Sequence, residues 1–305
     1  MNTHNLSFGY YPQTLDVSAG AVSISTIPNL TDIVFAIEKD SEHVAGDWIY
    51  APPQEVLQFG GNIVKMPYPT RIFGLPKTHI LSHSSPDNDD HLRFHLWVLS
   101  FFVGMRLTST EAGFIDSTPI KPNKLFDFVL TGQGIVDVLV LAEAFWAKHR
   151  TKSERAKLIA GIIHALFLSQ NPHHLQFERF LLLYSAFDAC FALAKSIQKP
   201  PEYLKHGQRI SWMCKLFGMQ IPAWADDSGV LSTEIASLRN ESVHEALFMG
   251  EPLGFVLHGV GTGVNLTLEM EALACRLLIA LLGSDKMDYV ASPVTTRQQY
   301  AIRLM

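Results

Sequence analysis

Phe177-Glu178-Arg179-Phe180-Leu181-Leu182-Leu183-Tyr184-Ser185-Ala186-Phe187-Asp188-Ala189 is the stretch that decides how the larger part of this chain folds. It lies within a predicted helix over residues 174–198. Its apolar side chains form a broad surface around that helix: Phe177, Phe180, Leu181, Tyr184, Phe187, Phe191 and Leu193. Other elements must cover a surface this apolar, since an amphipathic helix buries its apolar face. The stretch therefore predicts a helical domain with this segment in its core.

Two carboxylates, Glu178 and Asp188, interrupt the apolar surface of this helix. Burying a carboxylate without a partner is costly, so each of them, if buried, requires a cation, a backbone donor or water. Arg239 is one candidate partner. The alternative is that both acids face solvent, as most acidic side chains do.

Helical patterns continue on both sides of this segment, from Leu125 to Gly283. We predict helices over residues 125–148, 153–169, 174–198, 202–217, 228–248 and 267–283. Pro172, Pro200-Pro201 and Pro222 fall between them, where helix breakers belong. The glycine-rich, β-branched residues 254–268 predict a small hairpin.

The sequence before about Pro122 is irregular and prone to form strands. Strands are predicted over residues 22–25, 33–38 and 44–50, and a helix over residues 91–105 after the capping cluster Asp87-Asn88-Asp89-Asp90. We therefore predict an α+β fold, in which a β-rich N-terminal domain (1–122) precedes an all-α helical domain (123–285). Residues 286–305 are predicted to form a C-terminal tail.

Composition narrows the classes of protein that this chain can represent. The 305 residues are 48% hydrophobic and 17% charged, a globular balance, and the net charge of −5 argues against a broad electrostatic grip on nucleic acid. The first residues show no signal peptide, and the longest apolar runs are too short or too interrupted by charge to span a membrane. Cys190, Cys214 and Cys275 lie far apart in apolar contexts, which favours buried structural thiols and a cytoplasmic location.

The hexapeptide Arg239-Asn240-Glu241-Ser242-Val243-His244 carries the main functional signal. Within about two helical turns it places a permanent cation, an amide and a titratable imidazole. Arg239 can neutralise charge on a phosphate with its bidentate fork, and His244 has a pKa suited to proton transfer near neutrality. Asn240 can orient the histidine or the phosphate. Together they predict cleavage of RNA by attack of a 2′-hydroxyl, without a metal or any other cofactor.

Helical geometry limits how this motif can work. Asn240 and His244 are four residues apart and share a face, but Arg239 and His244 are five apart and diverge by about 140° on an ideal helix. They meet if the arginine wraps round, if the helix deforms, or if a second copy of the chain completes the site. Two such helices that pair across a twofold axis would supply that second copy.

At this point the chain resembles the HEPN superfamily, and within it most closely the ApeA-type branch. The resemblance rests on Leu238 to Glu245 together with the stretch Phe177 to Ala189, and it covers roughly residues 125–283. It implies a helical bundle that dimerises, with an R-x4-6-H motif at a shared cleft. Arg239, Asn240 and His244 match that motif as catalytic residues, and Glu178 or Asp188 would be the supporting polar residue on an earlier helix.

The resemblance implies that the protein is a metal-independent ribonuclease that acts in toxin–antitoxin systems, phage (antiviral) defence or RNA processing. Some members of the superfamily only bind RNA or partner proteins, so a non-catalytic RNA- or protein-binding module is the second hypothesis. The expected partners are an RNA substrate, a second copy of the chain, and an antitoxin or regulator that the sequence does not identify. No membrane partner is expected.

Three other interpretations compete with this hypothesis. Arg239, Asn240 and His244 could simply cap and bridge a helix, with nearby glutamates as partners. His79, His83, His91 and His95 flank an acidic cluster, and the i, i+4 pair His91 and His95 could centre a metal-dependent activity, although a third ligand at a recognisable spacing is missing. Gly259-Val260-Gly261-Thr262-Gly263 lacks the lysine of a phosphate-binding loop, which favours a turn.

Overall fold

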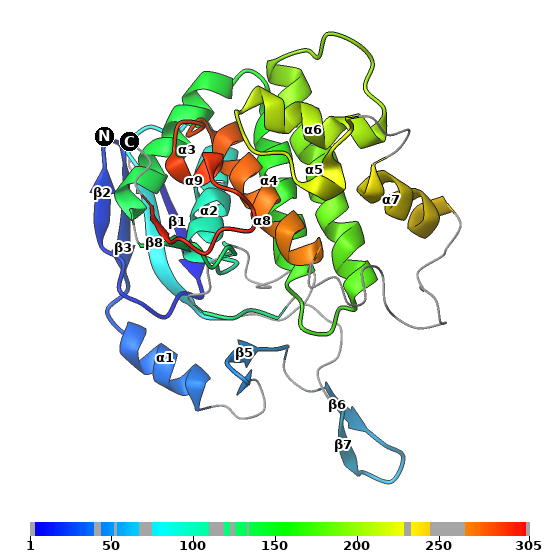
Figure 1. Cartoon of the computed structure of the whole chain (residues 1–305). Helices are drawn as coiled ribbons and strands as arrows, with labels where there is room; N and C mark the ends of the chain where they lie inside the picture. The colour runs from blue at the N-terminus through cyan, green and yellow to red at the C-terminus, as the bar shows by residue number, and fades with distance from the viewer. Residues whose placement is uncertain are drawn as a thin grey trace. The chain divides into compact units, whose positions relative to one another are not determined.

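The computed structural model describes residues 4–39, 44–51, 54–66, 75–109, 119–122, 126–132, 134–228, 233–244 and 266–302 (Figure 1). The chain forms two compact units. The N-terminal unit comprises Met1–Leu125 and Ile135–Val140, and the C-terminal unit comprises Phe126–Gly134 and Leu141–Met305. Strands dominate the first unit and helices the second, so the predicted α+β fold class is confirmed.

A four-stranded antiparallel sheet, in the order β1-β8-β3-β2, forms the centre of the N-terminal unit. Its strands are β1 (His4–Gly9), β2 (Val17–Ala19), β3 (Val22–Thr26) and β8 (Lys77–His83). Ile24 of β3 pairs with Leu81 of β8, and both side chains are buried. The short strand predicted over residues 22–25 is confirmed, and β8 is a strand that the sequence did not indicate.

Two predicted strands of the N-terminal unit are wrong. Residues 33–38 belong to a helix, α1 (Leu30–Glu38). The apolar residues of this short run fit the spacing of a helix as well as that of a buried strand, so periodicity alone cannot distinguish the two. The strand predicted over residues 44–50 is two short strands, β4 (Val44–Ala45) and β5 (Trp48–Ile49). Gly46 and Asp47 between them have φ values of 56° and 66°, which form a tight hairpin turn.

A second hairpin and one long helix complete the N-terminal unit. The hairpin consists of β6 (Gln54–Leu57) and β7 (Ile63–Met66), and the helix is α2 (Asp89–Val103). The Asn88 side chain accepts a hydrogen bond of 3.1 Å from the His91 backbone N–H, and Gly104 ends the helix with a φ of 62°. The helix predicted over residues 91–105, with its polar cap, is therefore confirmed.

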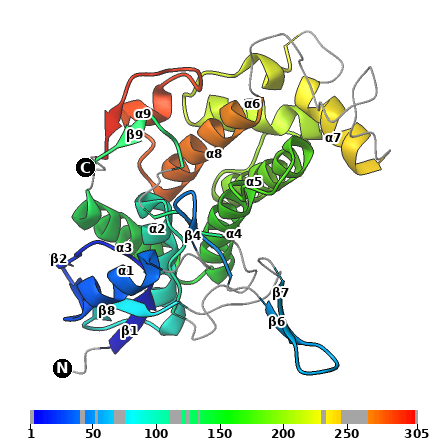
Figure 2. The same cartoon turned by 90° about the horizontal axis from the view of Figure 1, so that it is seen from below.

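Helices build the C-terminal unit, with α8 (Leu266–Leu282) almost entirely buried among them (Figures 1 and 2). Helices α4 (Ser153–Ser169) and α5 (Gln176–Ile197) lie side by side, and both contact α8. The unit also contains α6 (His206–Leu216), η1 (Ala223–Ala225), α7 (Glu234–His244) and α9 (Asp288–Ala291). These confirm the predicted helices to within four residues, except that α7 begins six residues after the predicted start at residue 228. The predicted end of α7 and nearly all of the hairpin over residues 254–268 lie outside the described residues.

The helix predicted over residues 125–148 begins ten residues later, as α3 (Ile135–His149), which is shared between the two units. Part of the segment before it forms β9 (Leu130–Thr131), which pairs in parallel with β10 (Tyr300–Ala301) in the predicted tail. Gly132 has a φ of 88°, which a helix cannot accommodate. The prediction of the helix start was therefore wrong because a pairing partner far along the chain holds this segment in a strand.

A buried ion pair joins the start of the C-terminal unit to α8. Arg276 donates a hydrogen bond of 2.6 Å to Asp127, and both side chains are almost completely buried. The Tyr289 hydroxyl donates to the same carboxylate oxygen at 2.9 Å, and Arg276 also donates to the Ser292 carbonyl oxygen at 3.0 Å. These bonds compensate the burial of the charges, which would otherwise be unfavourable.

Within the described residues, α5 alone is long and apolar enough to cross a membrane by length and composition. Half of its most apolar window is buried inside the unit, as is typical of a core helix, so the observation is weak evidence for a membrane span. Cys190, Cys214 and Cys275 are free and buried, as predicted, and burial raises the pKa of the Cys214 thiol to about 12. Their burial fits a structural role.

Candidate functional site

Asp188 on α5 is the centre of a polar group in the C-terminal unit. Arg209 on α6 donates a hydrogen bond of 2.8 Å from Nη1 to Asp188 Oδ1, and His206 Nδ1 lies 3.9 Å from the same oxygen. The Asp188 side chain is 41% exposed and that of Arg209 is 20% exposed, so the pair lies at the surface and is accessible from solvent. The Arg209 guanidinium also stacks over the Phe191 ring at 4.8 Å, which fixes its position.

Tyr184 joins this group from the preceding turn of α5. Its hydroxyl lies 3.3 Å from His206 Nδ1, at hydrogen-bonding distance. Burial of the ring, and then the negative charge of Asp188, raise the pKa of Tyr184 to about 12, while the positive charges of Arg239 and Arg209 act in the opposite direction. Tyr184 is therefore a neutral hydrogen-bonding group at neutral pH.

Helix α7 packs onto α5 and α6 through its apolar residues and so positions Arg239. Ile235, Ala236 and Leu238 are buried, and the three helices contact one another in pairs. Gly207 allows this close approach, because a Cβ atom built there would lie 2.9 Å from Thr233 Oγ1 and 3.4 Å from the Ala236 Cβ atom. The glycine next to His206 thus lets α7 approach the beginning of α6.

The predicted trio of the hexapeptide is described only in part. Arg239 is half-buried and donates a hydrogen bond of 3.1 Å from Nη1 to Oδ1 of the exposed Asn240. His244 is the last residue of α7, and its side chain lies outside the described part of the structure. Since all three residues share one helix, the divergence of about 140° between Arg239 and His244 expected from helix geometry applies to their backbone positions.

The two predicted supporting acids have different environments. Asp188 lies in the polar group described above. Glu178 is in the first turn of α5, where its Oε2 accepts a hydrogen bond of 2.6 Å from the Leu175 backbone N–H. The Glu178 carboxylate therefore caps the beginning of the helix. Ten residues separate Glu178 from Asp188, or about 15 Å along the helix. The structure therefore brings Asp188, and not Glu178, together with Arg209 and His206.

Sequence reasoning missed three members of this group: Tyr184, His206 and Arg209. Tyr184 and Asp188 are four residues apart on one helix, and His206 and Arg209 are three apart on another, so each pair shares a helical face. The sequence shows both spacings, but no pattern in it indicates that these faces of α5 and α6 pack against each other. The resulting group contains a guanidinium cation, an imidazole, a carboxylate and a phenol, which can bind a phosphate and transfer protons.

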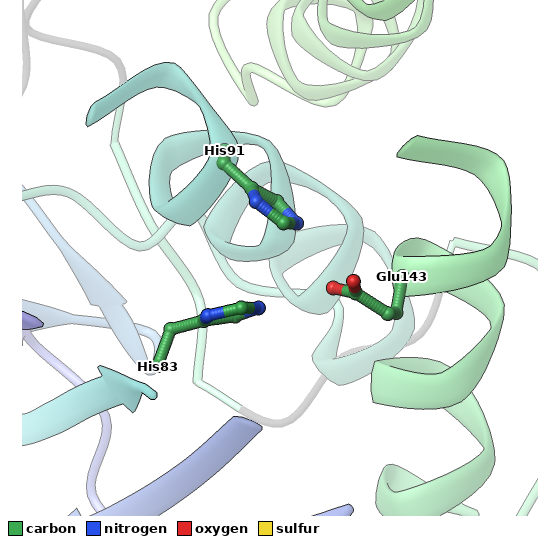
Figure 3. A group of neighbouring side chains, drawn as sticks. All are labelled: His83, His91 and Glu143. Carbon is green, nitrogen blue, oxygen red and sulfur yellow. The ribbon is translucent and has the colours of Figure 1, made fainter. Parts of the chain in front are cut away.

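Figure 3 shows His83 on β8 and His91 on α2, two neighbouring histidines of the N-terminal unit. The two imidazoles are buried, their ring centroids are 4.6 Å apart, and a ligand nitrogen of each lies within 4.8 Å of the other.

Hydrogen bonds of the two rings oppose metal binding through their Nε2 atoms. His83 Nδ1 accepts from the Ser85 backbone N–H at 3.0 Å, and His91 Nδ1 accepts from that of Asp87 at 3.3 Å. A neutral ring that accepts at Nδ1 carries its proton on Nε2, whereas a metal ligand must be unprotonated there. His95 differs, since its Nδ1 lies 3.0 Å from the His91 carbonyl oxygen and so carries the proton. The predicted pair His91 and His95 therefore does not offer two unprotonated Nε2 atoms.

Comparisons with known proteins add no further constraint on this site. No protein-family model, no curated protein and no solved structure matches the chain.

Proposed function

We propose that this protein is a metal-independent endoribonuclease of HEPN type that cleaves RNA at a site built on α5, α6 and α7. One observation carries the proposal: Arg209 and His206 contact Asp188, and α7, which carries Arg239 of the predicted motif, packs against both α5 and α6. Cations that can hold a phosphate and an imidazole that can move a proton are thus supplied by three helices that pack against one another.

The proposed reaction is an internal transesterification. A neutral His244 takes the proton of a ribose 2′-hydroxyl, and the 2′-oxygen forms a bond to phosphorus while the bond to the 5′-oxygen breaks. Arg239 neutralises the charge that grows on the non-bridging oxygens, and the leaving 5′-oxygen takes a proton from the imidazolium of His244 or of its symmetry mate. The products are a 2′,3′-cyclic phosphate and a free 5′-hydroxyl. Asn240 orients the Arg239 guanidinium, as supported by their hydrogen bond.

Asp188 and Arg209 are positioning residues in this proposal. Their ion pair holds the surface of α6 against α5 beside the phosphate, and Tyr184 keeps the His206 ring in place through its hydroxyl. We further propose that the protein acts in the cytoplasm as a homodimer, in phage defence or with an antitoxin. In the dimer, Arg239 of one protomer and His244 of its partner would compensate for their divergence of about 140° on one helix.

A non-catalytic module that binds RNA or protein through the same helices is the second candidate. The observation that favours it is the engagement of both arginines by neighbouring groups, Arg209 by Asp188 and Arg239 by Asn240, in a chain of net charge −5. This candidate predicts that the protein binds RNA and leaves it intact.

Incubation of the purified protein with RNA in the presence of a chelator separates these functions. Wild type is compared with Arg239→Ala and His244→Ala, and with Lys286→Gln as a control at a highly exposed side chain. The proposal expects cleavage by wild type and the control, and its loss in both motif variants. Intact RNA that is nevertheless bound by wild type would favour the module, and cleavage that the chelator abolishes would contradict the metal-free mechanism.

Mixing the two inactive variants tests the shared site. If Arg239 of one protomer works with His244 of the other, mixed dimers of Arg239→Ala and His244→Ala contain one intact pair, and part of the activity returns. If each site draws both residues from one chain, the mixture stays inactive. The histidine variant His206→Ala, tested alongside, reports whether the second imidazole is needed for cleavage.

A further inference from the structure

A pocket of about 810 Å³ lies at the beginning of α4. None of its lining residues belongs to the motif on α7. Its lining includes Lys152, Arg155 and Lys157, the hydroxyl-bearing residues Thr151 and Ser153, and one acid, Glu154. All of these residues belong to the C-terminal unit. The pocket is thus a second polar feature of the unit, with three cationic side chains against one carboxylate.

Positive charge is concentrated in this part of the chain. The ten residues from 148 to 157 contain five cations, Lys148, Arg150, Lys152, Arg155 and Lys157, and a single acid, in a protein whose net charge is −5. The segment runs from the end of α3 into the first turn of α4, whose macrodipole adds partial positive charge. Such a local excess attracts anions in spite of the acidic balance of the whole chain.

His149 is surrounded by the positive charges of this segment. Its ring is buried, and burial, followed by the charges of Arg155, Lys148 and Lys152, lowers the pKa of His149. Arg155 Nη1 donates to His149 Nδ1 at 2.8 Å, and Arg155 also binds the Ser196 hydroxyl at 3.1 Å. These acceptors are neutral groups, so the bonds hold the guanidinium in place without cancelling its charge.

Lys152 and Lys157 remain available for a ligand. Both are exposed, and within the described part of the chain neither forms an ion pair with a carboxylate. Their ammonium groups can reach an anion in the pocket without breaking an existing bond. Thr151 and Ser153, also exposed, offer hydroxyl donors at the same place. An oxygen-rich anion such as a phosphodiester matches this set of donors.

Helix α5 links the pocket to the candidate catalytic group. Ala192 and Ser196 line the pocket, and they follow Asp188 at intervals of four residues. Each interval advances about 6 Å along the helix and turns about 40° around it, so the three positions share one side of α5. Asp188 is half-exposed and the other two are exposed, so this side of the helix is open to solvent.

We propose that the pocket at the start of α4 binds the phosphate backbone of single-stranded RNA and holds the strand along the open side of α5, with the cleaved bond near Asp188 and Arg239. This inference rests on the proposed function, because it names the contact that guides the RNA substrate into that site. Lys152 and Lys157 supply the mobile charges, and Arg155 supplies the fixed one. The contact is to the backbone and carries no preference for base sequence.

Binding measurements test the inference without relying on cleavage. A fluorescein-labelled oligouridylate is titrated with full-length protein in the His244→Ala background, and the fluorescence anisotropy is followed over a range of salt concentrations. The test variant is Lys152→Gln/Lys157→Gln, since both lysines are exposed and make no bond that the fold needs. The matched control is Lys286→Gln/Arg297→Gln, which removes two exposed charges of the same unit outside the pocket lining.

For single-stranded nucleic acid, each phosphate contact contributes about −0.7 to the slope of log K against log salt, so the test variant should lose about 1.4 from that slope. Its affinity at low salt should also fall, while the control keeps both the affinity and the slope of its parent. Equal slopes and affinities in the two double variants would overturn the inference. Failure of the ribonuclease proposal looks different: wild-type protein would bind RNA through these lysines and never cleave it.

Discussion

Arg209 and Asp188 form a hydrogen-bonded ion pair of 2.8 Å that links α6 to α5 beside the motif-bearing helix α7. The same carboxylate lies 3.9 Å from His206, whose ring approaches the Tyr184 hydroxyl. Asp188 thus contacts a cation and an imidazole, and the imidazole in turn contacts the phenol of Tyr184. Its substitution should affect the site more than the fold.

Asp188→Asn should lower the rate of RNA cleavage strongly while costing less than about 1 kcal/mol of unfolding free energy, because exposed ion pairs contribute little to stability. The amide keeps the size of the side chain but no longer holds the Arg209 guanidinium by charge. Initial cleavage rates and urea denaturation measure the two effects. Asp285→Asn, at a partly exposed acid near Lys286, is the control and should change neither. Undiminished cleavage by Asp188→Asn would remove Asp188 from the site.

Gly207→Ala should reduce cleavage by displacing α7. The added Cβ atom would lie 2.9 Å from Thr233 Oγ1, so Thr233, which directly precedes α7, must move, at a cost of about 1–3 kcal/mol for overpacking. Gly161→Ala is the matched control, because no atom lies within 4 Å of its added Cβ and alanine favours a helix interior by about 0.5–1 kcal/mol. Equal activity and stability in the two variants would show that the contact between Gly207 and α7 does not position the site.

Asp127→Ala should destabilise the C-terminal unit by about 3–5 kcal/mol, since it leaves the buried Arg276 charge without its partner. The Tyr289 hydroxyl loses its acceptor at the same time. Thermal or urea unfolding measures the loss, and Asp32→Ala, at an exposed acid in the first turn of α1, serves as a control that should be close to neutral. Near-wild-type stability of Asp127→Ala would contradict the structural role assigned to this ion pair.

His149 should make the folded protein less stable at acidic pH. Its pKa is lowered in the folded protein, so below the ordinary value of 6.5 the unfolded chain binds a proton that the folded chain resists. Stability therefore falls as the pH drops through that value and continues to fall until the folded pKa is reached. His149→Gln, which keeps an acceptor for Arg155, should lose less stability than wild type between about pH 7 and about pH 5. Urea midpoints at both pH values test this; identical losses would count against it.

The helical unit could be predicted in detail from the sequence, and the reason is physical. Helices α4, α5 and α8 are long, and proline and glycine punctuate their ends, so local signals agree with the final packing. The start of α3 was missed because Leu130 and Thr131, which lie before it, pair with β10 far along the chain. Likewise, α1 was mistaken for a strand because a run of nine residues is too short for its periodicity to be decisive.

The residues of the candidate site that the sequence could indicate lie together on one helix. Arg239 and Asn240 are neighbours in sequence, and their hydrogen bond is local. The approach of Arg209 and His206 to Asp188 depends on how α6 packs on α5, which no local pattern specifies. The basic pocket could be predicted in part, because its charged residues lie within six positions of one another in the sequence, whereas Ala192 and Ser196 are supplied by another helix.

The chemistry of the new RNA end tests the central claim most directly. RNA of defined sequence is incubated with wild-type protein in chelator, and the fragment ends are identified by mass spectrometry. The account predicts fragments that end in a 2′,3′-cyclic phosphate and begin with a 5′-hydroxyl, and their absence with Arg239→Ala and with His244→Ala. Fragments with a 5′-phosphate, or cyclic-phosphate fragments formed at an undiminished rate by both variants, would contradict it.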